Sequence, residues 1–172
     1  MDNNVISALQ RTLADWGWAT MRFNFQGVGG SGGEYGNGQG EVRDLLAVAA
    51  YLKGKGKEAL HVAGYSFGAW IGLKAIVQGF EPASAIFVSP PLDFLDFSSL
   101  VLPQTHCLIT LGDRDSFCSL QTLHTWLAAQ KANRATVDLE TLSGCDHFYW
   151  NHEPLLSAKV SEFLKKHFQP PA

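Results

Sequence analysis

The stretch HVAGYSFGAWIGLKA, residues 61–75, decides the fold because it joins two apolar runs through a single tight turn. LHVAG is short and apolar, as expected of a strand, and the run after the turn is apolar on most sides, as expected of a buried helix. Ser66 stands between the two runs in the pattern G-x-S-x-G, flanked by Gly64 and Gly68. A serine in a strand–turn–helix connection is the arrangement of a nucleophile elbow.

The elbow has steric consequences for the backbone around Ser66. So sharp a turn predicts a positive φ angle at the serine, and close packing two residues to either side predicts no room for a Cβ atom at Gly64 or Gly68. The helix that follows points its first N–H groups toward a negative charge developing near the serine. We therefore expect Ser66 to be a nucleophile and the Phe67 N–H to be one oxyanion donor.

A second serine matches the same pattern, because GGSGG at residues 29–33 also reads G-x-S-x-G. This string continues into EYGNGQG, which is too rich in glycine to begin a helix at once. We therefore interpret Ser31 as a loop residue.

Apolar periodicity along the chain predicts that strands alternate with helices. Strands are expected at ATMRFNF, LHVAG, SAIFVS, HCLITLG and ATVDLETL, with further helices near residues 5–16, 42–52, 120–127 and 154–168. The first helix follows the capping candidates Asp2 and Asn3, and the last begins near Pro154. The alternation argues for one α/β domain over residues 1–172, with three layers and a mainly parallel sheet. Sites in such sheets lie at the carboxyl ends of the strands.

Two polar segments at strand ends supply partners for the serine, which needs a base and an acid that orients the base. GDRD ends the strand HCLITLG, so Asp113 and Asp115 are candidate acids. SGCDHFYW follows the last strand, which places the candidate base His147 at the same edge of the sheet. Singly, the aspartates could be turn residues and His147 a packed histidine, whereas the order Ser, Asp, His favours a catalytic triad.

GYSFGA, GDRD and DHFY in this order resemble the α/β-hydrolase superfamily. The block RFNFQGVGGSGGEYGNGQGE, residues 22–41, resembles small bacterial hydrolases related to the dienelactone-hydrolase and serine-aminopeptidase-like groups, with Gln26 where the family often has arginine. The resemblance implies Ser66 as nucleophile, His147 as general base and Asp115, the last residue of G-x-x-D, as the acid. Asp93, after the preceding strand, is a distant alternative.

The resemblance also implies a reaction: hydrolysis of a small-molecule carboxylic ester, thioester or amide through an acyl-enzyme, without a cofactor. Lids in this fold are usually inserted after SAIFVS, and the segment at residues 90–104 is too short for a cap domain. Tyr65, Phe148 and Tyr149 are candidate walls of the substrate pocket, although aromatic residues there could equally pack in the core.

The family's fold contains a further strand before the first helix expected here, placed between ATMRFNF and LHVAG in the sheet, and its loop supplies a second oxyanion N–H. MDNNVISALQ resembles an internal stretch of the family. We therefore expect an N-terminally incomplete sheet of five strands. Its exposed edges would favour a homo-oligomer.

Composition limits the binding partners and the cellular compartment that we expect for the protein. A net charge of −3 gives no electrostatic reason to bind nucleic acid or an anionic membrane, and no apolar segment is long enough to span a bilayer. The start MDNNVISALQR lacks the positive charge of a signal peptide, and three cysteines without a C-x-x-C or zinc spacing are typical of reduced thiols. We expect a cytoplasmic protein. His152 is poorly spaced from His147 for a shared metal, so no metal site is expected.

Two further function classes compete with the hydrolase. One is a truncated, non-catalytic relative that keeps the triad but lacks a competent oxyanion hole and acts as a structural or binding protein. The other is a nucleotide-binding domain, because Gly27, Gly29 and Gly32 spell G-x-G-x-x-G after an expected strand. That motif must open a helix, whereas glycine-rich loop continues almost to Val42.

Overall fold

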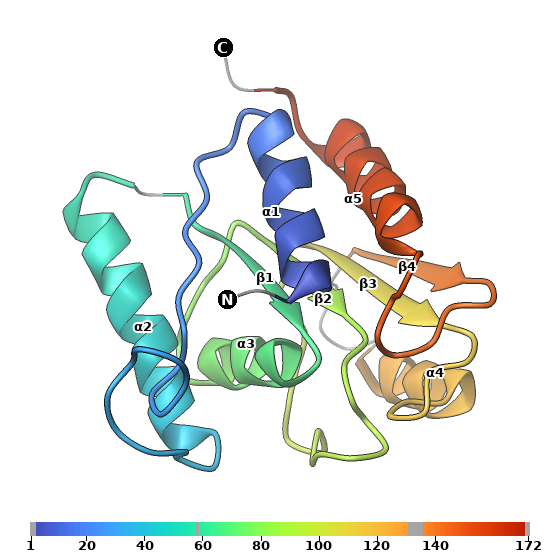
Figure 1. The fold of residues 1–172 in the computed structure, drawn as a ribbon, viewed down its shortest axis with the longest axis horizontal. Coiled ribbons are helices and arrows are strands. Elements are labelled where there is room, and N and C mark those ends of the chain that lie inside the picture. Colours follow the sequence, from blue (N-terminus) through green and yellow to red (C-terminus); the bar gives the residue numbers. More distant parts are fainter. Residues whose placement is uncertain (1–2, 58, 131–135, 171–172) are drawn as a thin grey trace.

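The computed structural model describes residues 3–57, 59–130 and 136–170, which contain five helices and four strands. The elements in chain order are α1 (Asn4–Asp15), α2 (Gln39–Gly54), β1 (His61–Tyr65), α3 (Phe67–Val77), β2 (Ser84–Val88), β3 (His106–Gly112), α4 (Leu120–Ala129), β4 (Val137–Leu142) and α5 (Glu153–His167). The sheet has the order β1-β2-β3-β4, and each strand is parallel to its neighbour (Figure 1).

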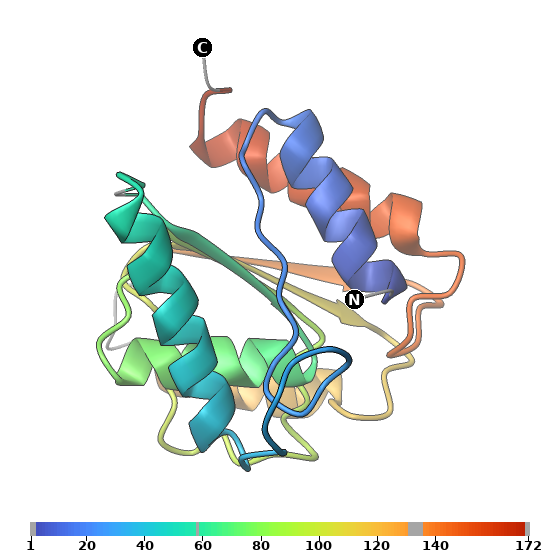
Figure 2. The same cartoon turned by 60° about the vertical axis from the view of Figure 1, so that its left-hand side comes forward.

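Helices cover both faces of this sheet, which confirms the three-layer α/β prediction. Helices α1 and α5 lie side by side on one face, and α2, α3 and α4 lie on the other (Figure 2). Each face has its own apolar core, one centred on residues such as Phe87 and Ile109, the other on Ile86 and Leu108. Because successive strand residues point to opposite faces, the apolar runs of β2 and β3 serve both cores at once.

Local sequence explains where the first and last helices begin. The Asn3 side chain accepts a hydrogen bond from the Ile6 N–H at 3.0 Å, so Asn3 is the N-cap of α1, while Asp2 lies outside the described residues. Pro154 occupies the first turn of α5, where its missing N–H costs nothing. Both capping predictions that the structure can test are confirmed.

The expected strand at ATMRFNF is wrong. Residues 18–25 have no strand hydrogen bonding, although they run past the open edge of β1 on their way from α1 to the glycine-rich loop (Figures 1 and 2). A strand needs a neighbour about 4.8 Å away, and here an open groove of about 690 Å³ separates the segment from β1. Its walls come mainly from residues 17–23, Phe25, β1, α1 and α2, with further contributions from Lys57, Ala59, Leu60, Gly68 of α3 and Phe80.

The groove leaves β1 as an edge strand, consistent with the expected exposed edge. His61 and Ala63 are exposed, whereas all five residues of β2 are buried. The indole of Trp18 stacks on the His61 ring with centroids 3.9 Å apart, which joins the two sides at the amino end of the strand. Strands β2 and β3 are therefore enclosed between neighbouring strands, β1 and β4 are the two edge strands, and the groove lies beside β1.

Candidate active site

Ser66 occupies the turn between β1 and α3 in the conformation that the elbow requires. Its φ angle is 50°, and its N–H donates to the Val88 carbonyl at 2.9 Å, so the turn is fastened to the neighbouring strand. A Cβ atom at Gly64 would lie 2.5 Å from the Gly68 carbonyl oxygen, which confirms the need for glycine there. The same prediction is wrong for Gly68, because a Cβ atom there would meet nothing within 4 Å. Gly68 faces the groove.

Three predicted residues from distant parts of the chain form one hydrogen-bonded chain. With its proton on Nδ1, His147 donates to Asp115 Oδ2 at 2.9 Å and lies 3.0 Å from Oδ1. Its other ring nitrogen, Nε2, accepts from the Ser66 hydroxyl at 2.8 Å. These contacts match the geometry of a nucleophile, a base and an orienting acid.

Burial and additional hydrogen bonds fix the acid. The Asp115 side chain is 0% exposed, and that of His147 is 5% exposed. Asp115 Oδ1 also accepts from the backbone N–H groups of Phe117 and Cys118, at 2.8 and 3.2 Å. A carboxylate held by several donors in a dry site keeps its orientation, so it can hold the His147 ring in place.

The two alternative acids have other roles. Asp113 Oδ1 accepts from the Gly144 N–H at 2.7 Å and so shapes the loop before His147. Asp93 accepts from the Thr122 hydroxyl and the Ser119 N–H, both at 2.6 Å, and these bonds hold the pKa of its carboxyl below the ordinary range. Neither carboxylate has a hydrogen bond to His147 within the described part of the chain, whereas Asp115 has two.

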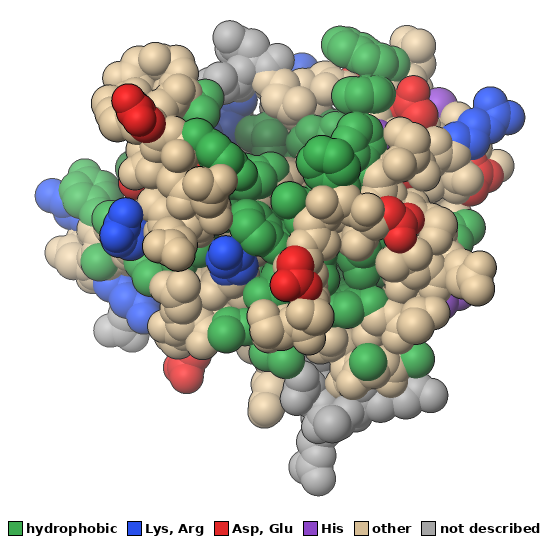
Figure 3. Space-filling view, turned by 90° about the horizontal axis from the view of Figure 1, so that it is seen from below, with side chains coloured by type: hydrophobic (Ala, Val, Ile, Leu, Met, Phe, Trp, Pro, Cys, Tyr) green, Lys and Arg blue, Asp and Glu red, His purple; other side chains and the backbone are tan. Residues whose placement is uncertain are grey.

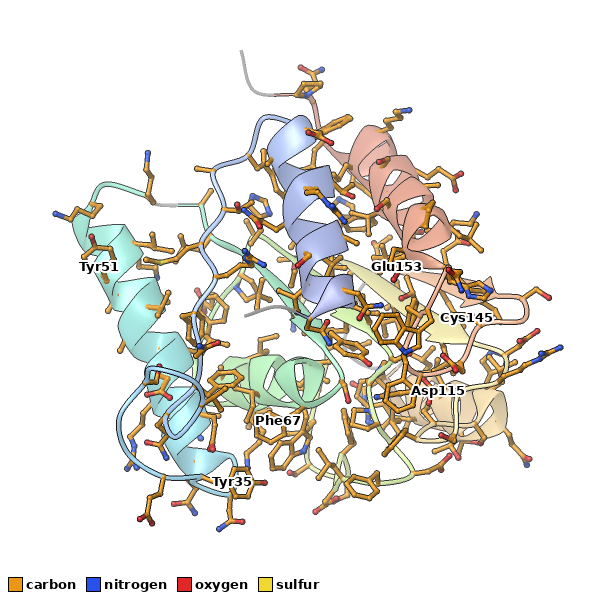
Figure 4. The ribbon with its side chains drawn as sticks, in the orientation of Figure 1. Tyr35, Tyr51, Phe67, Asp115, Cys145 and Glu153 are labelled. Carbon is orange, nitrogen blue, oxygen red and sulfur yellow. The ribbon has the colours of Figure 1, made fainter. Side chains whose placement is uncertain are left out.

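The oxyanion side of the site begins at the first turn of α3. Phe67 opens this helix, and within the described residues no hydrogen bond engages its N–H. The first N–H groups of a helix carry a partial positive charge and lack intrahelical partners. The Phe67 N–H is therefore free to donate a hydrogen bond to a charged oxygen. Figure 4 labels Phe67 at this helix start and Asp115 beyond the end of β3.

The loop between β4 and α5 carries the base and makes contacts that sequence reasoning missed. The Tyr65 hydroxyl donates to the His147 backbone carbonyl at 2.8 Å. The Phe117 ring lies against the His147 imidazole, with centroids 4.3 Å apart. Phe117 could have been suspected from its place two residues after Asp115, but nothing local in the sequence signals the long-range bond of Tyr65.

The three predicted pocket residues lie in different environments. Tyr149 is fully buried, and its hydroxyl is within hydrogen-bond distance of the hydroxyls of Ser89 and Thr110, at 3.0 and 3.2 Å. It belongs to the core beneath the site and not to a pocket wall. Tyr65 is half-buried, and Phe148 is 50% exposed.

Exposed aromatic residues surround the site on two sides. Tyr35 lies beside Phe67 with centroids 6.0 Å apart, and Phe94 packs edge-on against Phe117 at 5.4 Å. Both Tyr35 and Phe94 are largely exposed. Seen from this side, the molecule has hydrophobic side chains across the middle of its surface (Figure 3). Substrates would therefore meet an apolar rim.

The glycine-rich loop does not form a nucleotide site. The Ser31 hydroxyl donates to the Asn24 carbonyl at 2.9 Å, which confirms Ser31 as a loop residue. Helix α2 begins only at Gln39, so the G-x-G-x-x-G string does not open a helix and cannot present a helix N-terminus to a pyrophosphate. Instead, the Glu41 carboxylate anchors the loop by accepting from the Gly36 and Gly38 N–H groups.

Other chemistries find little support in the described part of the chain. No three metal-ligating side chains there gather into a possible metal site. All three cysteines are free and buried, and burial raises the pKa of the Cys118 thiol to about 12. None of the helices in that part combines the length and the apolar character needed to cross a membrane.

Known proteins with similar sequences and structures place the chain in a family. No family model matches, but the uncharacterized protein RP471 of Rickettsia prowazekii is 32% identical over 95% of this chain and 72% of its own length. An alpha-beta serine hydrolase homologue from Coxiella burnetii is 33% identical, with a TM-score of 0.87 over 95% of this chain and 77% of that one. XC6422 from Xanthomonas campestris, a serine hydrolase without a lid, is 30% identical, with a TM-score of 0.87 over 96% and 74%. Together with the elbow and the Ser66–His147–Asp115 contacts, these likenesses show that the chain belongs to the α/β-hydrolase superfamily.

Proposed function

We propose that the protein is a serine hydrolase that cleaves small carboxylic esters, thioesters or amides through a Ser66–His147–Asp115 triad. The observation that carries this proposal is the continuous contact from Asp115 through both nitrogens of His147 to the Ser66 hydroxyl. The hydrolase fold of the relatives supports the same reaction class.

The reaction would begin when Ser66 Oγ attacks the carbonyl carbon of the substrate while its proton passes to His147 Nε2. The carbonyl oxygen becomes an oxyanion, with the Phe67 N–H as one donor. Collapse of this intermediate breaks the bond to the leaving group, which takes the proton from His147. Water, deprotonated by His147, then attacks the acyl-serine, and the acid product leaves with Ser66 regenerated. Asp115 orients the His147 ring throughout and stabilises the imidazolium.

The apolar rim supports a neutral acyl group as the substrate. Tyr35, Phe94 and Phe148 are at least half exposed around the site, and none of them carries a charge. An ester, thioester or amide with a short apolar acyl group would bury this surface without leaving an unpaired charge. Rates of hydrolysis measured on esters, thioesters and amides of the same acyl group would identify the preferred leaving group.

Hydrolysis of 4-nitrophenyl acetate and butyrate by the purified chain tests the proposal. We expect turnover that is lost in Ser66→Ala and His147→Ala and retained in Ser31→Ala, the matched serine of the other G-x-S-x-G string. Circular dichroism would establish that each variant is folded. A folded wild-type chain with no more turnover than Ser66→Ala would overturn the proposal and favour the non-catalytic relative.

A further inference from the structure

Tyr65 occupies an unusual place, because it precedes the nucleophile and also contacts the loop that carries the base. It is the last residue of β1, and its side chain packs on the α1/α5 side of the sheet. From there its hydroxyl donates to the backbone carbonyl of His147 at 2.8 Å. Its ring lies 5.4 Å from the His147 ring and 6.3 Å from the Tyr149 ring. One side chain thus connects the two segments that must meet for proton transfer.

The loop from residue 143 to residue 152 needs such a connection. Tyr149 and Asn151 have positive φ angles of 59° and 64°, so the loop follows a path that most residues disfavour. Other hydrogen bonds fasten the residues on either side of the base: the Gly144 N–H donates to Asp113, the Arg114 N–H donates to the Cys145 carbonyl, and the Asn4 amide donates to the Phe148 carbonyl. Within the described residues, the hydrogen bond to the backbone of His147 itself comes from Tyr65.

We propose that the Tyr65 hydroxyl is a positioning group that holds the His147 backbone so that Nε2 stays in line with Ser66 Oγ. The expected effect on the reaction rate rests on the proposed function. The expected effect on the position of the His147 ring rests on geometry alone. The hydrogen bond from Tyr65 holds the backbone of His147 at a fixed distance from the elbow. Asp115 holds the imidazole ring of the same residue through Nδ1.

The environment of Tyr65 keeps this hydrogen bond formed over a wide pH range. Burial, followed by the negative charges of Asp115 and Asp146, raises the pKa of Tyr65 to about 12. The phenol therefore remains a donor at every pH at which a histidine changes its charge. A phenolate could not donate, and it would repel the carboxylate that the triad uses.

Tyr65→Phe tests the proposal because it removes the hydroxyl and keeps the ring packing. We expect the rate of labelling by a fluorophosphonate to fall about 10- to 100-fold, since small displacements of reacting groups cost rates of this order. The final extent should stay at one adduct per chain, because a folded but misaligned site reacts slowly yet completely. With 4-nitrophenyl butyrate, kcat should fall and KM should change little. Tyr51→Phe, which removes an exposed hydroxyl on α2, is the matched control and should behave as wild type.

A second readout does not depend on activity. In spectra of histidine-labelled protein, the His147 ring should give one sharp set of signals in wild type and broadened or multiple signals in Tyr65→Phe. If wild type fails to react with the fluorophosphonate, the proposed function falls, and the spectra alone decide the positioning role. Unchanged His147 signals in Tyr65→Phe would overturn that role. So would labelling of Tyr65→Phe at the wild-type rate.

Discussion

Strands β1 and β2 are neighbours in one parallel sheet, yet their surroundings differ sharply. They have five residues each and pair along their whole length, from His61 with Ser84 to Tyr65 with Val88. Every residue of β2 is buried, while only Gly64 of β1 is buried. The difference lies in what stands beyond each strand: β2 has a strand on both sides, and β1 has one on one side and a groove on the other.

The comparison shows how the candidate site depends on contacts across the sheet. The candidate acid follows the interior strand β3, while the candidate nucleophile and base follow the two edge strands, β1 and β4. Three contacts tie the candidate nucleophile and its neighbour to other parts of the sheet edge: the Ser66 N–H with Val88, the Ser66 hydroxyl with His147, and the Tyr65 hydroxyl with His147. The open groove therefore borders the site without separating its parts.

The largest expected effect concerns Asp115, the candidate acid that follows the interior strand β3. Asp115→Asn should lower kcat about 10³- to 10⁴-fold, because an amide there no longer selects the His147 tautomer or stabilises the imidazolium. Asp113→Asn is the matched control, since its amide oxygen can still accept from the Gly144 N–H. Its kcat should fall less than about 10-fold. Ester hydrolysis by both variants measures the contrast, and equal losses would show that the acid is misassigned.

Two glycines of the elbow test whether the groove side is open. Gly64→Ala should lower the free energy of unfolding by about 1–3 kcal/mol or more, because its Cβ atom would meet the backbone of Gly68 and Ala69. Gly68→Ala should raise it by about 0.4–1 kcal/mol, because the Cβ atom enters open space and alanine restricts the unfolded chain. Urea unfolding measures both values. Destabilisation by Gly68→Ala comparable to that by Gly64→Ala would mean that the groove is filled in solution.

Substitutions of one alanine on each of two adjacent strands compare the edge strand β1 with the interior strand β2 directly. Ala85 on β2 is 0% exposed, so Ala85→Ser should cost about 1–3 kcal/mol by burying a hydroxyl without a partner. Ala63 on β1 is exposed, so Ala63→Ser should change the free energy of unfolding by less than about 0.5 kcal/mol. Thermal unfolding of the two variants under the same conditions measures the difference. Similar costs would contradict the open edge.

The smallest expected effect is the pH dependence contributed by Glu41, which anchors the glycine-rich loop on the groove side. Burial alone would raise the pKa of this carboxyl, but hydrogen bonds from the Gly36 and Gly38 N–H groups hold it below the ordinary value of 4.5. Because the folded pKa is the lower one, the stabilisation is present above pH 4.5 and is lost as the pH falls through the lowered pKa.

Glu41→Gln should therefore be less stable than wild type at pH 7, and the difference should shrink in acid. Urea unfolding at a series of pH values from 7 to about 3 follows this difference. Arg43→Gln, an exposed change on the same helix, is the control, because it keeps the Glu41 carboxylate. The difference in free energy of unfolding between Arg43→Gln and wild type should therefore not follow the titration of Glu41. A constant gap between Glu41→Gln and wild type at every pH would show that the carboxylate does not act through its charge.

Local sequence patterns predicted the elements whose residues are largely buried. The helix at Phe67–Val77 and the strand at His106–Gly112 have the bounds that their apolar runs indicate, because extensive burial leaves a nearly continuous apolar signal. The contacts among Ser66, His147 and Asp115 also followed from local order, since parallel strands bring their carboxyl ends to one edge. The pattern of ATMRFNF is that of a strand as well, but a strand forms only beside a partner, and no pattern within the segment shows whether one is present.

The wrong predictions for Gly68 and Tyr149 have the same cause: the surroundings of each residue come from distant parts of the chain. Gly68 has the sequence context of a tightly packed glycine, and only the three-dimensional arrangement shows that its side faces the groove. Tyr149 resembles a pocket residue because it follows His147 closely, yet its positive φ angle turns it into the core. The role of Tyr65 as a pocket wall stays a prediction, and the long-range bond from its hydroxyl to His147, 82 positions away in the chain, has no local signal in the sequence.

The most direct test of the central claim, that Ser66 is an activated nucleophile, is mass spectrometry of the purified chain after reaction with a fluorophosphonate. We expect one adduct per chain on the peptide that contains Ser66. The adduct should be absent in Ser66→Ala, and its formation should be strongly slowed in His147→Ala. A folded chain that acquires no adduct, or that acquires it on Ser31 or another residue, would contradict the claim.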